Sequence, residues 1–246
     1  MDKQEFQEEY YQFPYHYVPK YKNGNFIHYY SGNWFIEYIS FLEFLLEYLE
    51  KKEFHSIIEV GCGDGRIISE VYRKFKNKKI KGIDVSNKAI FFAKAFNYDI
   101  LEIFEAKNIE KCNQKYDIIL LIEVFEHIPL DIRDSFLKSL KKIMHKDSFL
   151  IMTVPHKNRQ MDIRHYEHFT LASLKSYFSD FELIESKFIA RKHKIVGWIY
   201  KILENDLFIL KKQSILNYFY KLYKNNFLFT DKEKEALRIF GVFKLK

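Results

Sequence analysis

The most constraining feature of the sequence is a glycine turn at residues 57–67, which reads IIEVGCGDGRI. An apolar run ends in Glu59, and three glycines follow at alternate positions, Gly61, Gly63 and Gly65, before a sequence that can continue as a helix. This order is typical of a buried strand, a tight turn and a helix N-terminus. Glycine permits positive φ and leaves no Cβ in the path of a ligand, and a helix N-terminus suits an anionic group. The segment therefore predicts a ligand site between a strand and a helix.

Two common phosphate-binding motifs do not fit this turn. The dinucleotide motif is G-x-G-x-x-G, whereas here the third glycine comes one position early and Arg66 follows it. A P-loop requires a Lys-Ser or Lys-Thr pair after its last glycine, and this chain has neither pair there. The turn alone does not identify the ligand, so the context supplied by the next strands decides.

Two further segments follow the turn. The first, KIKGIDVS, is an apolar run that ends in Asp84, placed like the acid that holds a ribose in Rossmann-type sites. The second is YDIILLIEVFEHIP, residues 116–129, a third apolar run that leads into an acidic loop with a histidine. Together with the glycine turn, these segments resemble a class I S-adenosylmethionine (SAM)-dependent methyltransferase over roughly residues 55–190.

The resemblance implies that SAM binds over the carboxyl ends of the first strands and that S-adenosylhomocysteine is the product. Glu59 and the backbone after it would face the amino-acid part of SAM, and Asp84 would accept both ribose hydroxyls. Glu105 or Ala106 would lie near the adenine, although the chain reads E-A-K-N where many relatives carry an acid-Ala pair. The implied cofactor residues are Glu59, Gly61, Cys62, Gly63, Gly65, Asp84, Val85, Glu105, Ala106 and Glu123.

Three candidate catalytic residues, Glu123, Glu126 and His127, follow the fourth predicted strand at positions i, i+3 and i+4. In a helical loop these side chains would share one face. His127 is the best candidate for a general base, because the ordinary pKa of histidine is near neutral. The alternative is that Glu126 and His127 only brace the loop.

Three further histidines are candidate substrate residues: His156 after the fifth strand, and His165 and His168 in the segment RHYEHFT. Glu-x-x-Glu-His with a distant histidine also resembles metal-dependent 2′-O-methyltransferases of small-RNA 3′ ends, and ubiquinone-pathway O-methyltransferases share part of it. Carboxylates and imidazole could hold a divalent metal. The F-E-W element of the RNA enzymes is missing, and R-H-x-x-H-F-T also occurs in methyltransferases without a metal. We therefore assign no metal ligands, and a divalent metal is not the favoured cofactor.

The predicted fold is α/β, a doubly wound, seven-stranded, Rossmann-like methyltransferase sheet with an N-terminal helical arm and a helical insertion before the last strand. Strands are expected near residues 56–60, 80–84, 99–104, 116–122, 147–154, 181–190 and 238–246, and helices near 34–50, 65–76, 87–96, 132–144 and 170–179. The expected units are an aromatic arm and helix (1–50), a SAM-binding core (51–190), a basic and aromatic helical insertion (191–236) and the final strand (237–246). The arm either packs over the domain or closes the substrate pocket.

Charge is distributed unevenly along the 246 residues. Residues 191–246 contain 13 Lys and Arg and 5 Asp and Glu, which gives a net charge of +8. Residues 1–190 contain 27 Lys and Arg and 28 Asp and Glu, which gives a net charge of −1. A neutral body disfavours nucleic acid as a partner. The basic insertion either is a solvated cap or faces an anionic membrane or a phosphorylated or lipid-linked acceptor.

The remaining composition favours a cytoplasmic protein, with a peripheral place at the inner membrane surface as an extension of the basic insertion. The two cysteines do not form a disulfide framework, and Cys62 lies inside the glycine turn. The acidic start MDKQEFQEEY does not resemble a signal peptide, and no run of 18 apolar residues predicts a transmembrane helix.

The sequence therefore predicts a SAM-dependent methyltransferase, with O-methylation of a small-molecule or glycan- or lipid-like acceptor as the preferred activity. The first alternative is a metal-assisted RNA 3′-end 2′-O-methyltransferase. The second is a non-catalytic SAM-binding module that docks on a membrane or a partner. No motif identifies the acceptor or the oligomeric state.

Overall fold

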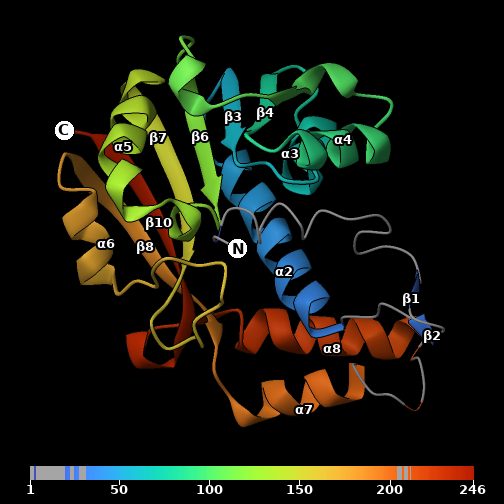
Figure 1. Ribbon diagram of the computed structural model, residues 1–246. Coiled ribbons are helices and arrows are strands. Elements are labelled where there is room, and N and C mark those ends of the chain that lie inside the picture. Colours follow the sequence, from blue (N-terminus) through green and yellow to red (C-terminus); the bar gives the residue numbers. More distant parts are fainter. Residues whose placement is uncertain are drawn as a thin grey trace.

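The computed structural model describes residues 3, 20–22, 25–27, 32–203, 207, 210 and 212–246. Its centre is an eight-stranded mixed sheet (Figure 1) in the order β5-β4-β3-β6-β7-β10-β8-β9. The strands of this sheet are β3 (Ser56–Val60), β4 (Lys79–Asp84), β5 (Phe104–Ala106), β6 (Tyr116–Ile122), β7 (Met144–Pro155), β8 (Phe181–Arg191), β9 (Phe229–Thr230) and β10 (Ala236–Leu245).

The first five strands of the sheet in chain order, β3 to β7, run parallel, and β10 inserts antiparallel between β7 and β8. The last two strands predicted from the sequence, near residues 181–190 and 238–246, therefore pair with each other in antiparallel fashion. The predicted count of seven was short by one, because β9 pairs with β8 through only two residues, Phe229 and Thr230. A two-residue strand is too short to show alternating hydrophobicity in the sequence.

Helices cover both faces of the sheet (Figure 1). Ile57 and Ile118 belong to the core shared with the helices α2, α3 and α4, whereas the adjacent Ile58 and Ile119 belong to the core under α5 and α6. Neighbouring residues on a strand point to opposite faces, so a strand covered on both sides reads as a continuous apolar run. These helices are α2 (Gly32–Glu50), α3 (Arg66–Lys74), α4 (Asn87–Phe96), α5 (Arg133–Lys142) and α6 (Leu171–Tyr177).

The third predicted strand was misplaced. Residues Leu101–Ile103 form a short 3₁₀ turn, and β5 begins only at Phe104. Ile103 and Phe104 are both buried, so the apolar run was read correctly as core. A short apolar run does not distinguish a strand from a buried helical turn, which explains the error.

The predicted insertion contains two helices, α7 (Lys194–Leu203) and α8 (Gln213–Asn226). Both pack against α2 (Figure 1). Most of the predicted aromatic arm lies outside the described residues, which include the short strands β1 (Lys20–Lys22) and β2 (Asn25–Ile27). Within the described part of the chain, no helix is both long enough and apolar enough to cross a bilayer.

Candidate active site

The glycine turn joins β3 to α3 through three residues with positive φ: Gly61 at 75°, Gly63 at 54° and Gly65 at 77°. A Cβ on Gly61 would lie 2.5 Å from Val124 Cγ2, and one on Gly65 would lie 2.4 Å from Phe104 Cε1. Backbone conformation and close packing therefore both require glycine at these two positions.

Asp84, at the end of β4, is hydrogen-bonded to this turn. Its Oδ2 accepts a hydrogen bond from the Gly63 N–H at 2.9 Å, and its Oδ1 accepts one from the Ser86 N–H at 2.8 Å. Ser86 in turn caps α4, because its hydroxyl accepts from the Ala89 N–H at 3.1 Å. The carboxylate is therefore held in a fixed orientation beside the turn.

Glu59 lies beneath the turn and is 2% exposed. Burial raises the pKa of its carboxyl well above 4.5, and the nearby charges of Asp64 and Asp84 act in the same direction. Its Oε2 has no hydrogen-bond partner among the described residues. An unpartnered buried acid suits a ligand that brings a positive charge, and the ammonium group of SAM is one such ligand.

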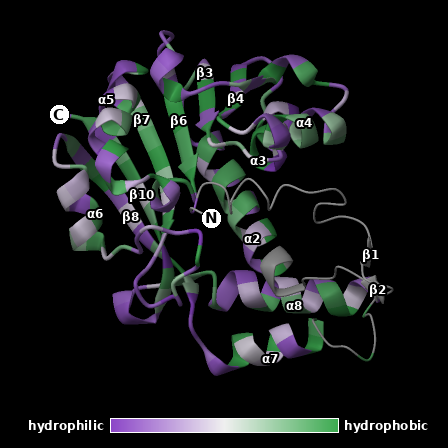
Figure 2. Cartoon of the chain, viewed as in Figure 1, coloured by the Kyte–Doolittle hydropathy of each residue, from purple (hydrophilic) through white to green (hydrophobic). Residues whose placement is uncertain are grey.

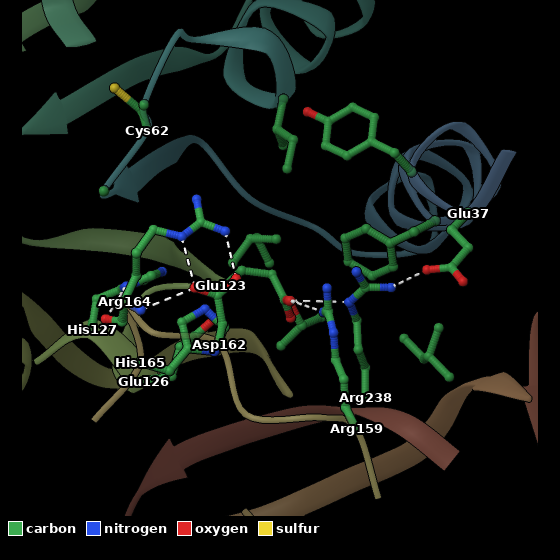
Figure 3. Close-up of a pocket in the computed structure, with 18 of the residues that line it drawn as sticks. Glu37, Cys62, Glu123, Glu126, His127, Arg159, Asp162, Arg164, His165 and Arg238 are labelled. Atoms are coloured by element: carbon green, nitrogen blue, oxygen red, sulfur yellow. Dashed lines mark hydrogen bonds and ion pairs between the residues drawn. The ribbon is translucent and has the colours of Figure 1, made fainter. Parts of the chain in front are cut away.

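Two cavities meet beside these residues. The larger has a volume of about 390 Å³ and is lined by residues of the predicted adenosine side, among them Asp84, Val85, Asn108 and Ile109. The second has a volume of about 250 Å³ (Figure 3) and is lined by Glu59, Cys62, Gly63 and residues of α2, β7, β8 and β10, among others. Gly61, Glu123 and His127 line both cavities.

Glu123 and Glu126 have opposite electrostatic environments. Burial disfavours ionisation of Glu123, but the adjacent Arg238 and Arg159 outweigh burial and lower its pKa. Its Oε2 accepts from Arg238 Nε at 3.0 Å and lies 3.6 Å from Arg159 Nη1. Glu126 is fully buried, and burial together with the charge of Glu123 raises its pKa well above 4.5. Neither carboxyl oxygen of Glu126 has a partner in the described part of the chain.

The hydrogen bonds of His127 determine its tautomer. Its Nδ1 lies 3.2 Å from the carbonyl oxygen of Arg164. A carbonyl only accepts, so Nδ1 carries the hydrogen and the neutral ring has its lone pair on Nε2. Burial lowers the pKa of His127 below 6.5, so the ring is neutral at pH 7 and can accept a proton.

A second chain of hydrogen bonds orients His165. His168 Nδ1 lies 3.2 Å from the Arg159 carbonyl oxygen, and His168 Nε2 lies 2.8 Å from His165 Nδ1. By the same argument His165 donates from Nδ1 and has its lone pair on Nε2. Burial lowers the pKa of His165 to about 3. One ligand atom each from Glu126, His127 and His165 lies within 4.8 Å of the others, so these three residues could hold a metal ion.

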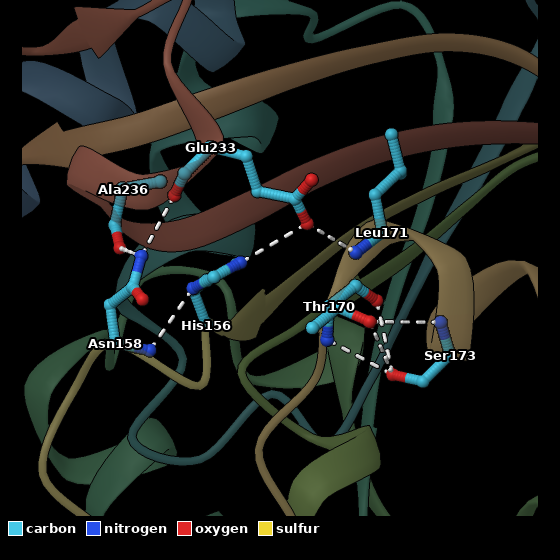
Figure 4. A network of polar contacts seen from close by, with 7 residues as sticks. All are labelled: His156, Asn158, Thr170, Leu171, Ser173, Glu233 and Ala236. Atoms are coloured by element: carbon cyan, nitrogen blue, oxygen red, sulfur yellow. Dashed lines mark hydrogen bonds and ion pairs between the residues drawn. The ribbon is translucent and has the colours of Figure 1, made fainter.

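Some predicted site residues lie elsewhere. His156 does not line either cavity, because its Nε2 bonds Glu233 Oε1 at 3.2 Å and its Nδ1 accepts from the Asn158 N–H (Figure 4). Glu105 likewise lies outside both linings, and Lys81 and Lys107 pair with its carboxylate and lower its pKa. His168 is buried behind His165 rather than in a cavity lining.

Sequence reasoning missed several lining residues. Asn108 and Ile109, two and three positions after Ala106, take the place beside the larger cavity that was assigned to Glu105 and Ala106. Glu37 and Arg238 line the second cavity and are joined by an ion pair, Arg238 Nη1 to Glu37 Oε2, at 2.5 Å (Figure 3). Glu37 looks in the sequence like one more polar residue of an amphipathic helix, so no local signal identified it.

One described residue of the arm reaches the site. Lys3 donates a hydrogen bond to the carbonyl oxygen of His165, a residue of the second cavity, and its ammonium lies 5.1 Å from the centre of the Tyr166 ring. The rest of the arm, including the aromatic residues proposed as a lid, lies outside the described residues. Its role as a lid stays a prediction.

Comparison with known proteins gives the same family as these features. The model of the methyltransferase domain family matches residues 28–185. Residues of the chain are 31% identical over 134 residues to (S)-coclaurine N-methyltransferase of Thalictrum flavum subsp. glaucum, covering 52% of this chain and 36% of that protein. The chain is also 35% identical over 88 residues to the mitochondrial ubiquinone biosynthesis O-methyltransferase of Saccharomyces cerevisiae. This match covers 33% of this chain and 28% of that protein. The matches thus span only about a third of the length of these relatives.

A solved structure shares the fold over nearly the whole chain. Magnesium protoporphyrin IX methyltransferase from Synechocystis PCC 6803, crystallised with SAM, superimposes with a TM-score of 0.59 and covers 99% of this chain and 98% of its own, at 13% identity. The glycine turn, Asp84 and the unpartnered Glu59 fit SAM, and relatives of this fold were crystallised with SAM or its product. The chain therefore belongs to the methyltransferase domain family and has the class I fold of SAM-dependent methyltransferases.

Proposed function

We propose that the protein transfers the methyl group of SAM to a hydroxyl oxygen of a small-molecule or glycan- or lipid-like acceptor, with His127 as the general base. The observation that carries this proposal is the place of His127, which lines both cavities at their junction. A donor that extends from the larger cavity into the second would present its methyl group beside this ring, to an acceptor in the second cavity. Its pKa, lowered by burial, leaves it neutral and able to accept a proton.

The two cavities suggest how each substrate is held. Asp84, Val85, Asn108 and Ile109 would bind the adenosine part of SAM, and Glu59 would face its ammonium group. The acceptor would occupy the remaining part of the second cavity. SAM supplies a methyl group already activated by the sulfonium, so the protein contributes mainly proximity and orientation.

In the proposed step, Nε2 of His127 takes the proton of the acceptor hydroxyl as its oxygen attacks the methyl carbon. The new O–CH₃ bond forms while the S–CH₃ bond breaks, and the bonding electrons stay on sulfur in neutral S-adenosylhomocysteine. Glu123, kept ionised by Arg238 and Arg159, would stabilise the resulting imidazolium electrostatically.

A panel of acceptors tests the activity. The protein would be incubated with radiolabelled SAM and, in turn, with phenols, sugars, lipid-linked alcohols, carboxylic acids and amines. Transfer to a hydroxyl acceptor that is lost in His127→Ala supports the proposal. Transfer to amines alone would contradict O-methylation and leave the assignment as a methyltransferase intact.

A metal-assisted form of the same reaction is the second candidate, and one observation favours it. Glu126, His127 and His165 form a compact set of one carboxylate and two imidazoles. The Arg164 carbonyl sets the tautomer of His127, and His168 sets that of His165. This donor set suits Mn²⁺, Co²⁺, Fe²⁺ or Zn²⁺. A bound metal would polarise the acceptor hydroxyl and would compete with the role of His127 as a base.

Calorimetric titration with Mn²⁺ and Co²⁺ distinguishes the two forms without relying on activity. The metal-assisted form requires saturable binding that His165→Ala and Glu126→Gln both abolish. Undiminished turnover after exhaustive chelation, together with no heat of metal binding, would leave the metal-free form alone.

A further inference from the structure

The inner faces of α7 and α8 are packed against the domain. Val196 and Ile199 of α7 are 5% and 2% exposed, and the hydroxyl of Tyr200 donates to Glu37 of α2. On α8, Tyr223 is buried and Lys224 pairs with Glu43 Oε2 at 2.8 Å. These contacts hold both helices on the domain and leave their outer faces to be explained.

Large apolar side chains occupy the outer faces. Trp198 is 71% exposed and Ile195, one turn earlier on α7, is 47% exposed. On α8, Tyr218 is 63% exposed and Ile215, also three positions earlier, is 38% exposed. Residues three apart lie on the same side of a helix, so each helix presents an apolar stripe away from its packed face. Figure 2 shows hydrophobic and hydrophilic residues interspersed along both helices.

The charges on these helices have one sign. Neither α7 nor α8 contains an acidic residue. Residues 191–226 contain eight Lys and Arg and two acids, Glu204 and Asp206, both outside the described residues. Five lysines of this segment are exposed and form no ion pair with any residue that the structure describes: Lys192, Lys194, Lys201, Lys212 and Lys221.

We propose that the outer faces of α7 and α8 dock the protein on an anionic lipid bilayer. Exposed Trp and Tyr with aliphatic neighbours suit the boundary between headgroups and acyl chains, where an amphipathic ring has one side in water. Lysines beside them reach the phosphates, and each contributes to attraction by a negatively charged surface. The helices lie in the interface and do not span the membrane.

Charge also argues against a second copy of the chain as the occupant. Two such segments would bring together ten lysines that have no ion pair in the described part of the chain, and like charges at one interface repel. A single-stranded nucleic acid would meet basic and aromatic groups as well, but such proteins carry them along a groove. None of these exposed lysines and aromatic residues lines either of the two cavities of the candidate active site.

Co-sedimentation with vesicles tests the proposal. The full chain should bind vesicles of phosphatidylglycerol and phosphatidylcholine in about equal parts, but not pure phosphatidylcholine, and should dissociate near 1 M salt, where the screening length falls to about 3 Å. Changing Lys194, Lys201, Lys212 and Lys221 to Glu should lower partitioning by about 10²–10³-fold or more. The matched control changes four exposed lysines on other elements to Glu: Lys76, Lys138, Lys146 and Lys175.

Tryptophan fluorescence reports on the apolar stripe directly. The chain has two tryptophans, so in a Trp34→Phe background Trp198 is the only indole. Its emission should shift to shorter wavelength with anionic vesicles, and Trp198→Ala should weaken partitioning by about 10–100-fold. Equal binding by the parent and the four-lysine variant would overturn the proposal, as would equal loss in the control variant. Release from vesicles by a low concentration of single-stranded RNA, with tight RNA binding, would instead identify nucleic acid as the occupant.

Discussion

Arg238 on the last strand donates from Nε to Oε2 of Glu123, which directly follows β6, although 115 positions separate them. The same guanidinium donates from Nη1 to Glu37 Oε2 at 2.5 Å. Arg238 is largely buried, with 15% of its side chain exposed, and Glu123 and Glu37 raise its pKa although burial acts in the opposite direction. A single cation thus joins α2, β10 and the junction of the two cavities.

Replacement of Arg238 by Gln should destabilise the protein by about 1–3 kcal/mol, because the two partly buried carboxylates of Glu37 and Glu123 lose their shared cation. The pKa of Glu123 should rise, since Arg238 is the largest of the charges that lower it. Urea denaturation measures the loss. Adding Glu37→Gln to the variant should restore part of the stability, whereas Arg191→Gln, a more exposed pairing with Glu235, is the control with a much smaller effect. An equal loss in both single variants would contradict the role of burial.

Asp84→Ala should weaken binding of S-adenosylhomocysteine by about 10²–10⁴-fold. Two charge-assisted hydrogen bonds to the ribose, worth about 1.5–3 kcal/mol each, would be lost. The Gly63 N–H would also lose its acceptor, so the glycine turn would lose its hydrogen bond to the end of β4. Isothermal titration calorimetry measures the affinity, with Asp147→Ala at an exposed site as the control. Wild-type affinity in Asp84→Ala would show that the ribose lies elsewhere.

His127→Ala should reduce turnover by about 10²–10⁴-fold with little change in affinity for S-adenosylhomocysteine. In the parent, kcat/KM should rise with pH while His127 loses its proton, with a midpoint below pH 6.5, because burial lowers the pKa of this ring. The pH profile of the remaining activity of the variant should lack this limb. His55→Ala, at an exposed histidine, serves as the control. A parallel loss of binding and rate would make His127 a structural residue.

Gly61→Ala should destabilise the protein by about 1–2 kcal/mol or more, from the left-handed conformation alone. The added methyl would also meet Val124 Cγ2 at 2.5 Å, next to both cavities, so cofactor affinity should fall as well. Gly197→Ala in α7 is the matched control, because a Cβ there meets nothing within 4 Å. Alanine in a helix interior is favoured over glycine by about 0.5–1 kcal/mol, so this variant should gain stability. The reverse order of the two variants in thermal denaturation would refute the packing argument.

Glu126 should make the unliganded protein less stable as the pH rises. Its folded pKa lies well above the ordinary 4.5, so the folded state keeps a proton that the unfolded chain releases. The contribution of protonated Glu126 to the free energy of unfolding is therefore fully present below about pH 4.5. It is lost as the pH rises through the pKa that Glu126 has in the folded state. Glu126→Gln removes this ionisation, so its stability relative to the parent should increase between these limits. Urea denaturation across a pH series measures the difference, with Glu182→Gln as the exposed control. A constant difference at all pH values would contradict the raised pKa.

The sequence determined the parts of the site that rest on local chain geometry. Gly61 and Gly65 need positive φ, Asp84 ends a strand, and Glu123, Glu126 and His127 follow the next one. Parallel strands bring their carboxyl ends to one edge of the sheet, so the order of these motifs was enough to place them together. The strands themselves were also recognisable in the sequence, because a strand covered on both faces appears as a continuous run of apolar residues.

The tertiary structure alone decided the acceptor side of the site. Glu37, Arg159 and Arg238 come from three segments that are distant in the sequence. No local pattern distinguishes a helix glutamate that contacts Arg238 from a helix glutamate that faces water. His156 and Glu105 carry the expected chemistry at the expected strand ends, but Glu233 holds the first and two lysines hold the second. Which charged groups face a cavity depends on long-range partners, because a buried charge is tolerated only where another part of the chain compensates it.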